Sequence, residues 1–151
     1  MMSVKHKKMN AHGMSKQAGF TLIEMMVVVT VIALLIGMIG PMVFNQVEKA
    51  QHTVVKQDIK TIESALKFYR LDNFRYPSQA EGLEALINPP ADNNNWNGPY
   101  LETLPMDPWG RPYRYANPST HNKQVDIFTL GNDDMQGGEG SNKDWGNWNI
   151  K

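Results

Sequence analysis

Four acidic side chains gather in a glycine-rich stretch near the carboxyl end, where residues 131–146 read GNDDMQGGEGSNKDWG. The acids are Asp133, Asp134, Glu139 and Asp144. Calcium takes about six to eight oxygen ligands from carboxylates and carbonyls, and glycines let a loop turn its carbonyls inward. The spacing is not that of an EF-hand, and composition alone favours a solvated loop. The residues therefore permit a calcium site without requiring one.

Other chemistry has little support in the sequence. There is no cysteine, which excludes disulfides, thiol nucleophiles and cysteine-ligated zinc. The histidines are scattered rather than spaced as metal ligands, at positions His6, His12, His52 and His121. The sequence contains no recognisable phosphate-binding loop or Ser/His/Asp triad. Asp133 with Asp134 is a weak candidate for an acid–base pair. We predict that the protein is not an enzyme.

A single acid, Glu24, interrupts an otherwise apolar amino-terminal run. Residues 20–44 read FTLIEMMVVVTVIALLIGMIGPMVF, and as a helix they would span about 37 Å, enough to cross a bilayer. A carboxylate there needs a partner. Cleavage after Gly19 would supply one, because the new α-amino group of Phe20 in one copy could pair with Glu24 of a neighbour. The alternatives are that Glu24 favours the helix N-terminus or lies in interfacial water.

The residues before this run form a basic leader. Residues 1–19 hold four lysines and no acid, so their removal leaves 11 basic and 15 acidic residues. The lysines should stay on the cytoplasmic side of the membrane, which places the rest of the chain on the outer side. The rest of the chain is mildly acidic, which argues against nucleic-acid binding. A conventional signal peptide needs small residues after the apolar run, but here they precede it, at Ala18-Gly19. An uncleaved anchor is the simpler alternative.

Beyond Phe44 the pattern predicts an amphipathic helix to about Leu71. Gly37, Gly40 and Pro41 should weaken the helix just before it. Its apolar stripe should pack on the downstream domain, and comprises Val47, Ala50, Val54, Ile59, Ile62, Leu66 and Tyr69.

The last eighty residues predict a small domain with little regular structure. Ser78–Glu81 is a capping box that should start a helix to about Ile87. Asp107-Pro108-Trp109-Gly110 fits a type I turn. Strands are expected at 112–116 and 125–130, with a third near 147–150. The expected fold is therefore α+β, a long helix packed on a small antiparallel sheet.

Several motifs together resemble a known family, the type IV pilins and, more closely, the major pseudopilins of type II secretion. The amino-terminal motif is Gly19–Glu24 before an apolar run and Pro41. The later motifs are Tyr76-Pro77, Glu81-Gly82-Leu83, Asp107-Pro108-Trp109-Gly110, Asp126-Ile127-Phe128 and Gly146-Asn147-Trp148. Major type IV pilins usually carry a disulfide that this chain cannot form.

The resemblance implies a set of sites. Prepilin peptidase would cleave between Gly19 and Phe20, and Phe20 would be N-methylated. Glu24 and Pro41 would serve assembly. One structural calcium would be bound by Asp133, Asp144 and the carbonyl of Leu130. Some relatives have an acid where this chain has Lys143, so Glu139 or another carbonyl could complete the ligand set.

The resemblance also implies an organisation and a function. Its parts would be a leader (1–19), a membrane-spanning helix (20–44), an amphipathic helix (45–71) and a periplasmic domain (72–151) whose calcium loop is 130–146. A single-pass precursor in the bacterial inner membrane would polymerise into a periplasmic filament that helps export folded proteins. Its partners would be further copies, minor pseudopilins, prepilin peptidase and an inner-membrane assembly platform. The alternatives are an adhesion or DNA-uptake pilin, or a monomeric anchored binding module that uses Trp96 and Trp109.

Overall fold

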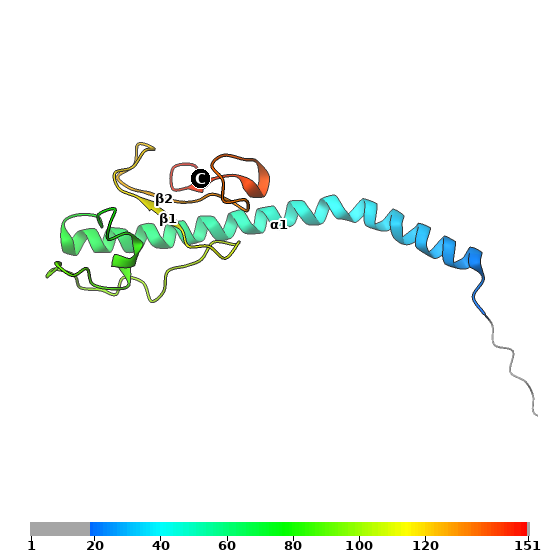
Figure 1. The fold of residues 1–151 in the computed structure, drawn as a ribbon, viewed down its shortest axis with the longest axis horizontal. Helices are drawn as coiled ribbons and strands as arrows, with labels where there is room; N and C mark the ends of the chain where they lie inside the picture. Colours follow the sequence, from blue (N-terminus) through cyan, green and yellow to red (C-terminus); the bar gives the residue numbers. More distant parts are fainter. Residues whose placement is uncertain (1–18, 151) are drawn as a thin grey trace, which may run out of the picture. The chain divides into compact units, whose positions relative to one another are not determined.

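The computed structural model describes residues 19–150, except for the side chains of Pro41 and Met42, and the predicted leader before Gly19 lies outside these residues. In chain order the elements are helix α1 (Leu22–Asn73), the 3-10 helix η1 (Leu83–Leu86), strands β1 (Arg114–Ala116) and β2 (Asp126–Thr129), the 3-10 helix η2 (Gly140–Asn142) and strand β3 (Trp145–Gly146) (Figure 1). The chain forms two compact units divided between Gly40 and Pro41.

Helix α1 spans 52 residues and includes Gly37, Gly40 and Pro41. It begins after Thr21, whose hydroxyl accepts a hydrogen bond from the backbone N–H of Glu24 at 3.2 Å. This is the usual way in which a threonine caps a helix. The helix ends two residues beyond the predicted Leu71, because the Asn73 amide donates to the carbonyl of Tyr69 at 2.7 Å and satisfies one of the last free acceptors.

The second half of α1 packs on the rest of its own unit. Val55, Ile59, Ile62, Leu66 and Tyr69 are at most 1% exposed, at the alternating spacing of one helix face. Each buried side chain of this size stabilises the fold by about 1.5–3 kcal/mol. The core against which they pack includes Leu83, Leu86, Tyr113, Val125 and Ile127.

The predicted stripe was correct from Ile59 onward but wrong at its start. Val54 and Val47 are 45% and 47% exposed, whereas Val55 is fully buried. Val55 lies four residues before Ile59 and therefore on the same face of the helix. Val54 lies on a different face and is exposed to solvent. The fully buried face therefore begins at Val55, although Trp145 also packs on His52 just before it.

The three strands form one antiparallel sheet in the order β1-β2-β3. Tyr115 pairs with Ile127, and Phe128 pairs with Gly146. The predicted strand at 147–150 is wrong, because β3 lies earlier, at Trp145–Gly146. The Asn149 side chain accepts from the Gly146 N–H at 2.9 Å, and Asn149 N donates to the Gly146 carbonyl at 3.0 Å. These bonds turn the chain at the point where the strand was expected to run.

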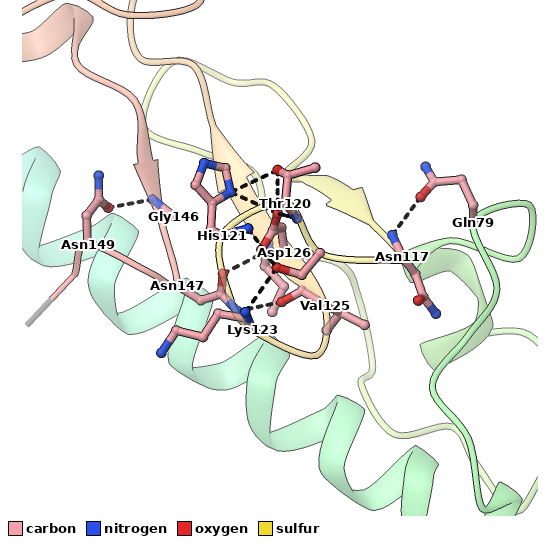
Figure 2. Close-up of polar contacts among 12 residues, drawn as sticks. Gln79, Asn117, Thr120, His121, Lys123, Val125, Asp126, Gly146, Asn147 and Asn149 are labelled. Carbon is pink, nitrogen blue, oxygen red and sulfur yellow. Dashed lines mark hydrogen bonds and ion pairs between the residues drawn. The ribbon is translucent and has the colours of Figure 1, made fainter.

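Strand β2 buries an acid among its apolar neighbours. Val125, Ile127 and Thr129 are buried, and the intervening Asp126 is only 1% exposed. Its carboxylate accepts hydrogen bonds from Ser119 Oγ at 2.5 Å and from Thr120 N at 2.8 Å, and His121 Nδ1 lies 2.9 Å away (Figure 2).

Burial alone would raise the pKa of Asp126, but the hydrogen bonds from Ser119, His121 and Thr120 outweigh it and lower that pKa. The ring of His121 stacks on Trp148, with the ring centroids 3.6 Å apart. The cluster therefore ties the 119–121 turn and the carboxyl terminus to the sheet in a domain without disulfides.

The predicted capping box at Ser78–Glu81 is present, but the α-helix after it is not. Ser78 N donates to Glu81 Oε2 at 2.6 Å, and Glu81 N donates to Ser78 Oγ at 3.3 Å. The helical turn then stops at Gly82, whose φ of 57° lies in the left-handed region. The chain continues only as the short η1, because a left-handed residue ends an α-helix.

Candidate assembly and calcium sites

The first unit presents an apolar helix that nothing in the described chain covers. Its large apolar side chains are exposed throughout, from Leu22 at 79% to Ile39 at 55%. By length and composition α1 qualifies as a membrane-spanning helix. Uncovered apolar surface of this extent requires lipid or protein around it.

The predicted processing site precedes this helix. Gly19 and Phe20 lie in irregular backbone before Leu22, and Phe20 is 77% exposed. The peptide bond between them is therefore outside any regular element. Glu24 lies in the first turn of α1 and forms no ion pair within residues 19–150. The carboxylate thus remains available to a partner outside this chain.

The predicted calcium loop has its two ends held together by the sheet. Thr129 of β2 pairs with Trp145 of β3. In this antiparallel register Leu130 and Asp144 are the next two residues. The carbonyl and the carboxylate predicted as ligands are therefore brought to the same edge of the sheet.

Asp144 has one carboxylate oxygen engaged and one unused. Oδ2 accepts a hydrogen bond from Gly137 N at 2.8 Å. Oδ1 is buried and has no hydrogen-bond partner among the described residues. A buried acceptor without a partner costs free energy and requires an explanation. A bound cation at Oδ1 would supply the missing partner.

The other acids of the loop have different surroundings. Asp133 is exposed, and its Oδ1 accepts from Met135 N at 3.2 Å. Asp134 is paired with Arg114 at 2.9 Å and lies 3.9 Å from Arg111. Glu139 is exposed just before η2. Asp133 therefore remains a candidate ligand, while Asp134 is already neutralised by arginine.

The glycines of this loop allow close approach of backbone carbonyls. Gly131 has a φ of 69°, and a Cβ there would lie 2.8 Å from the carbonyl oxygen of Ser141. No group of three or more His, Cys, Asp or Glu side chains converges within the described residues. A calcium ion would therefore need carbonyl oxygens beside Asp133 and Asp144. Such a hard-oxygen donor set fits calcium.

Lys143 and His52 both pack on Trp145. The Lys143 ammonium lies 4.6 Å from the centroid of the Trp145 ring, as in a cation–π contact. The His52 ring centroid lies 4.1 Å from the same ring, and Nε2 is buried. The loop folds back over this part of α1, so His52 is partly buried.

Arg111 was not predicted from the sequence, and it fastens the predicted calcium loop. Its guanidinium donates to the carbonyl of Gly131 and, at 3.2 Å, to that of Asn132. It also lies 3.7 Å from the buried Asp107, which accepts from Thr129 Oγ1 at 2.5 Å. The only signal was that Arg111 directly follows the predicted turn at 107–110. That turn is confirmed by the bond from Gly110 N to the Asp107 carbonyl at 2.9 Å.

The two tryptophans considered for a binding module serve the chain itself. Trp96 Nε1 donates to the carbonyl of Ala85 at 2.8 Å, and its ring meets that of Tyr100 edge-on with centroids 5.8 Å apart. Trp109 is partly buried against the hydrophobic core. Both indoles therefore pack internally rather than line one shared site.

Known proteins resemble this chain along most of its length. The family model "Type II secretion system (T2SS), protein G" matches residues 42–148, and the "Prokaryotic N-terminal methylation motif" matches residues 14–40. Two curated relatives are each named "Type II secretion system core protein G". The Pseudomonas aeruginosa protein is 47% identical, with 88% of this chain and 96% of the relative covered. The Vibrio cholerae protein is 44% identical, with 91% and 96% covered.

A solved structure agrees with the fold. It is the crystal structure of the major pseudopilin from the type 2 secretion system of enterohaemorrhagic Escherichia coli. It matches with a TM-score of 0.58 and 38% sequence identity, covering 69% of this chain and 91% of that chain. The α+β, pilin-like fold predicted from the sequence is confirmed.

Proposed function

Because the chain belongs to the type II secretion system protein G family, we propose that it is the major structural subunit of a type II secretion pseudopilus. In this function it polymerises into a periplasmic filament that helps export folded proteins across the outer membrane. It acts by assembly and not as an enzyme.

One observation carries this proposal: an uncovered apolar helix holds a single acid near its start. Glu24 is the fifth residue counted from Phe20, and the side chains around it are exposed. In the precursor, lipid would cover this helix. In the filament, equivalent helices of other copies would replace the lipid, and a contact that does not close into a ring generates a helical polymer.

Processing would switch the subunit between these two states. Prepilin peptidase would cleave after Gly19, and the new α-amino group of Phe20 would be methylated, as the matched methylation motif suggests. That amine would then pair with Glu24 of a neighbouring copy. A buried ion pair satisfies both charges in an apolar bundle, and the pairing would fix the axial stagger between subunits.

The same reasoning gives the location and the partners. The precursor would cross the inner membrane once, with the domain from about residue 72 in the periplasm. An inner-membrane assembly platform would extract it, and minor pseudopilins would join the same filament. These partners follow from membership of the family and from the apolar α1 helix.

One structural calcium ion would complete the domain. Asp144 Oδ1, the Asp133 carboxylate and the Leu130 carbonyl would hold it, with further oxygens from the loop. When bound, the ion would supply positive charge to the acidic loop and close it. The residues themselves would fix the ends of the loop through the β2–β3 pairing and through Arg111.

Two measurements on protein from its native membrane test the proposal. The intact mass should correspond to a chain that begins at Phe20 with one added methyl group. Glu24→Gln should leave the subunit folded and inserted but abolish filaments, because the amine of a neighbour loses its counter-charge. Asp92→Asn, at an exposed acid in the domain, serves as the matched control and should assemble normally.

A full-length mass with the leader retained would contradict the processing step. Normal filaments from Glu24→Gln would contradict the pairing. A retained leader would also move the anchored binding module to first place.

A further inference from the structure

The carboxyl end of α1 carries an exposed apolar patch made of Phe68, Leu71 and Phe74. These side chains are 62%, 68% and 86% exposed. Within this patch Leu71 and Phe74 line one hollow, and Phe68 faces another. Nothing among the described residues covers them. A patch of large apolar side chains at one place usually marks a contact surface.

The conformation and exposure of Phe74 are energetically unfavourable in the isolated chain. Its φ is 57°, in the left-handed region, and its N–H donates to the carbonyl of Arg70 at 2.8 Å. This position closes a helix and favours glycine or asparagine. A phenylalanine here has backbone strain and a solvated ring, and neither is compensated within its own subunit. A contact with another molecule would compensate for both.

The patch borders a hollow with a basic rim. The hollow has a volume of about 440 Å³ and is lined by Lys67, Arg70, Leu71, Phe74 and Tyr76. Arg70 lies over the Tyr76 ring and donates to Gln124, and it forms no ion pair with an acid in residues 19–150. Lys67 forms no ion pair that involves the described acids. The hollow therefore suits an apolar side chain flanked by acids.

The chain itself contains such a segment, in residues 132–142. This segment has three acids, no basic residue and one large apolar side chain, Met135, which is 67% exposed. The backbone that leads into Met135 is fixed, because Asp133 Oδ1 accepts from Met135 N and Asp134 pairs with Arg114. Methionine adapts well to irregular apolar hollows and to aromatic rings.

The two surfaces lie at opposite ends of the second unit. Gly140 lies beside Glu48, because a Cβ there would be 2.8 Å from Glu48 Oε1. Glu48 and Leu71 are 23 residues apart on α1, which corresponds to about 35 Å along the helix. In Figure 1 the orange loop lies away from the green end of α1. One subunit therefore cannot bring the two surfaces together.

We infer that Met135 of one copy docks in the Leu71–Phe74 hollow of the next copy along the filament. This inference rests on the proposed function, because it needs a polymer. The contact joins two different surfaces of the same chain, so it is heterologous and repeats without closing. The Lys67 and Arg70 rim would face Glu139, the acid of segment 132–142 that is neither paired with Arg114 nor assigned to calcium.

Phe74→Gly is the decisive variant, because folding and assembly should respond in opposite directions. Glycine relieves the left-handed strain, so the thermal midpoint of the full chain in detergent should stay the same or rise. The critical concentration for filament formation should rise about tenfold, since a phenylalanine loses its burial in the contact. Wild-type assembly by this variant would overturn the inference.

A cross-link tests which surfaces meet, since the chain contains no cysteine. The double variant Leu71→Cys with Met135→Cys should give a ladder of disulfide-linked multimers when filaments are oxidised. The matched control pairs Leu71→Cys with Met106→Cys, at another exposed methionine, and should give no ladder.

The outcomes separate the two proposals. If the wild-type chain forms no filaments, the proposed function fails, and the inference fails with it. If wild-type filaments form but the Leu71/Met135 pair gives no ladder, or Leu71→Cys links to a different protein, only the inference is overturned.

Discussion

The two halves of α1 share one helix but differ in what covers them. From Val55 to Tyr69 one face is fully buried by the rest of its own chain. From Leu22 to Ile39 the apolar side chains have no cover within the described residues. Burial of the apolar side chains in the second half therefore stabilises the fold of a single subunit. The apolar side chains of the first half can be buried only by lipid or by other subunits.

The difference explains why folding and assembly can be separated in one molecule. A substitution in the covered half should act on the unfolding of the subunit, and one in the uncovered half should act on insertion and polymerisation. The first half is apolar on all sides, as expected for a helix that exchanges lipid for neighbours. The second half keeps a polar side because its domain covers only one face.

The largest expected effect compares one leucine from each half. Leu66→Ala, at a side chain 1% exposed, should lower the free energy of unfolding by about 2–5 kcal/mol, because it leaves a cavity. Leu34→Ala, at a side chain 67% exposed, should leave unfolding unchanged. Chemical denaturation of the full chain in detergent measures both. Equal losses would show that the two halves are not energetically distinct.

Calcium removal should have the next largest effect, and it should destabilise only the domain. With calcium at about a hundred times its dissociation constant, binding would stabilise the fold by about 2.7 kcal/mol. EGTA should therefore lower the thermal midpoint, increase hydrogen exchange in residues 128–150 and weaken filament assembly. The reason is that Asp144 Oδ1 would again lack a partner.

Asp144→Asn should abolish the response to EGTA, and Asp134→Asn is the matched control because its carboxylate is held by Arg114. Wild-type melting curves that superimpose with and without EGTA would eliminate the calcium site.

Elements with strong periodicity could be predicted from the sequence. Elements whose position depends on a single tertiary contact could not. The long helix and the strand expected at 125–130 followed from spacing. The position of the third strand did not, because it depends on pairing with β2, in which Phe128 lies opposite Gly146 and Thr129 opposite Trp145. No local pattern encodes such a contact.

The candidate sites also differ in how far they could be predicted from the sequence. Gly19, Phe20 and Glu24 could be predicted because their spacing relative to the apolar run is local. The role of Arg111 could not be predicted, because it depends on carbonyls at Gly131 and Asn132, some twenty residues away. The burial of Asp126 was missed for a related reason: its partners lie in a turn whose path the sequence does not specify.

The smallest expected effect is on pH dependence, and it should be confined to the covered half and its domain. The Arg75 guanidinium, 2.5 Å from Glu81, lowers the Glu81 pKa from 4.5 to about 2. The pKa of Asp126 is also lowered. A carboxyl whose pKa falls on folding stabilises the folded state above its unfolded pKa, and that stabilisation is lost as the pH drops through the folded value. Stability should therefore decline between about pH 4.5 and 2.

Asp58 acts in the opposite direction, because burial raises its pKa despite the hydrogen bond from Tyr113. The net contribution of the Arg75–Glu81 pair is only about 1 kcal/mol, as is usual for ion pairs at a surface. Glu81→Gln should flatten part of the acid decline, whereas Glu84→Gln, at an exposed neighbour, should not. Thermal midpoints at pH 7, 4 and 3 measure the effect. The helical signal from the uncovered half should persist in detergent at pH 3, since its stability depends on apolar cover, and its loss together with the domain would break the distinction between the two halves.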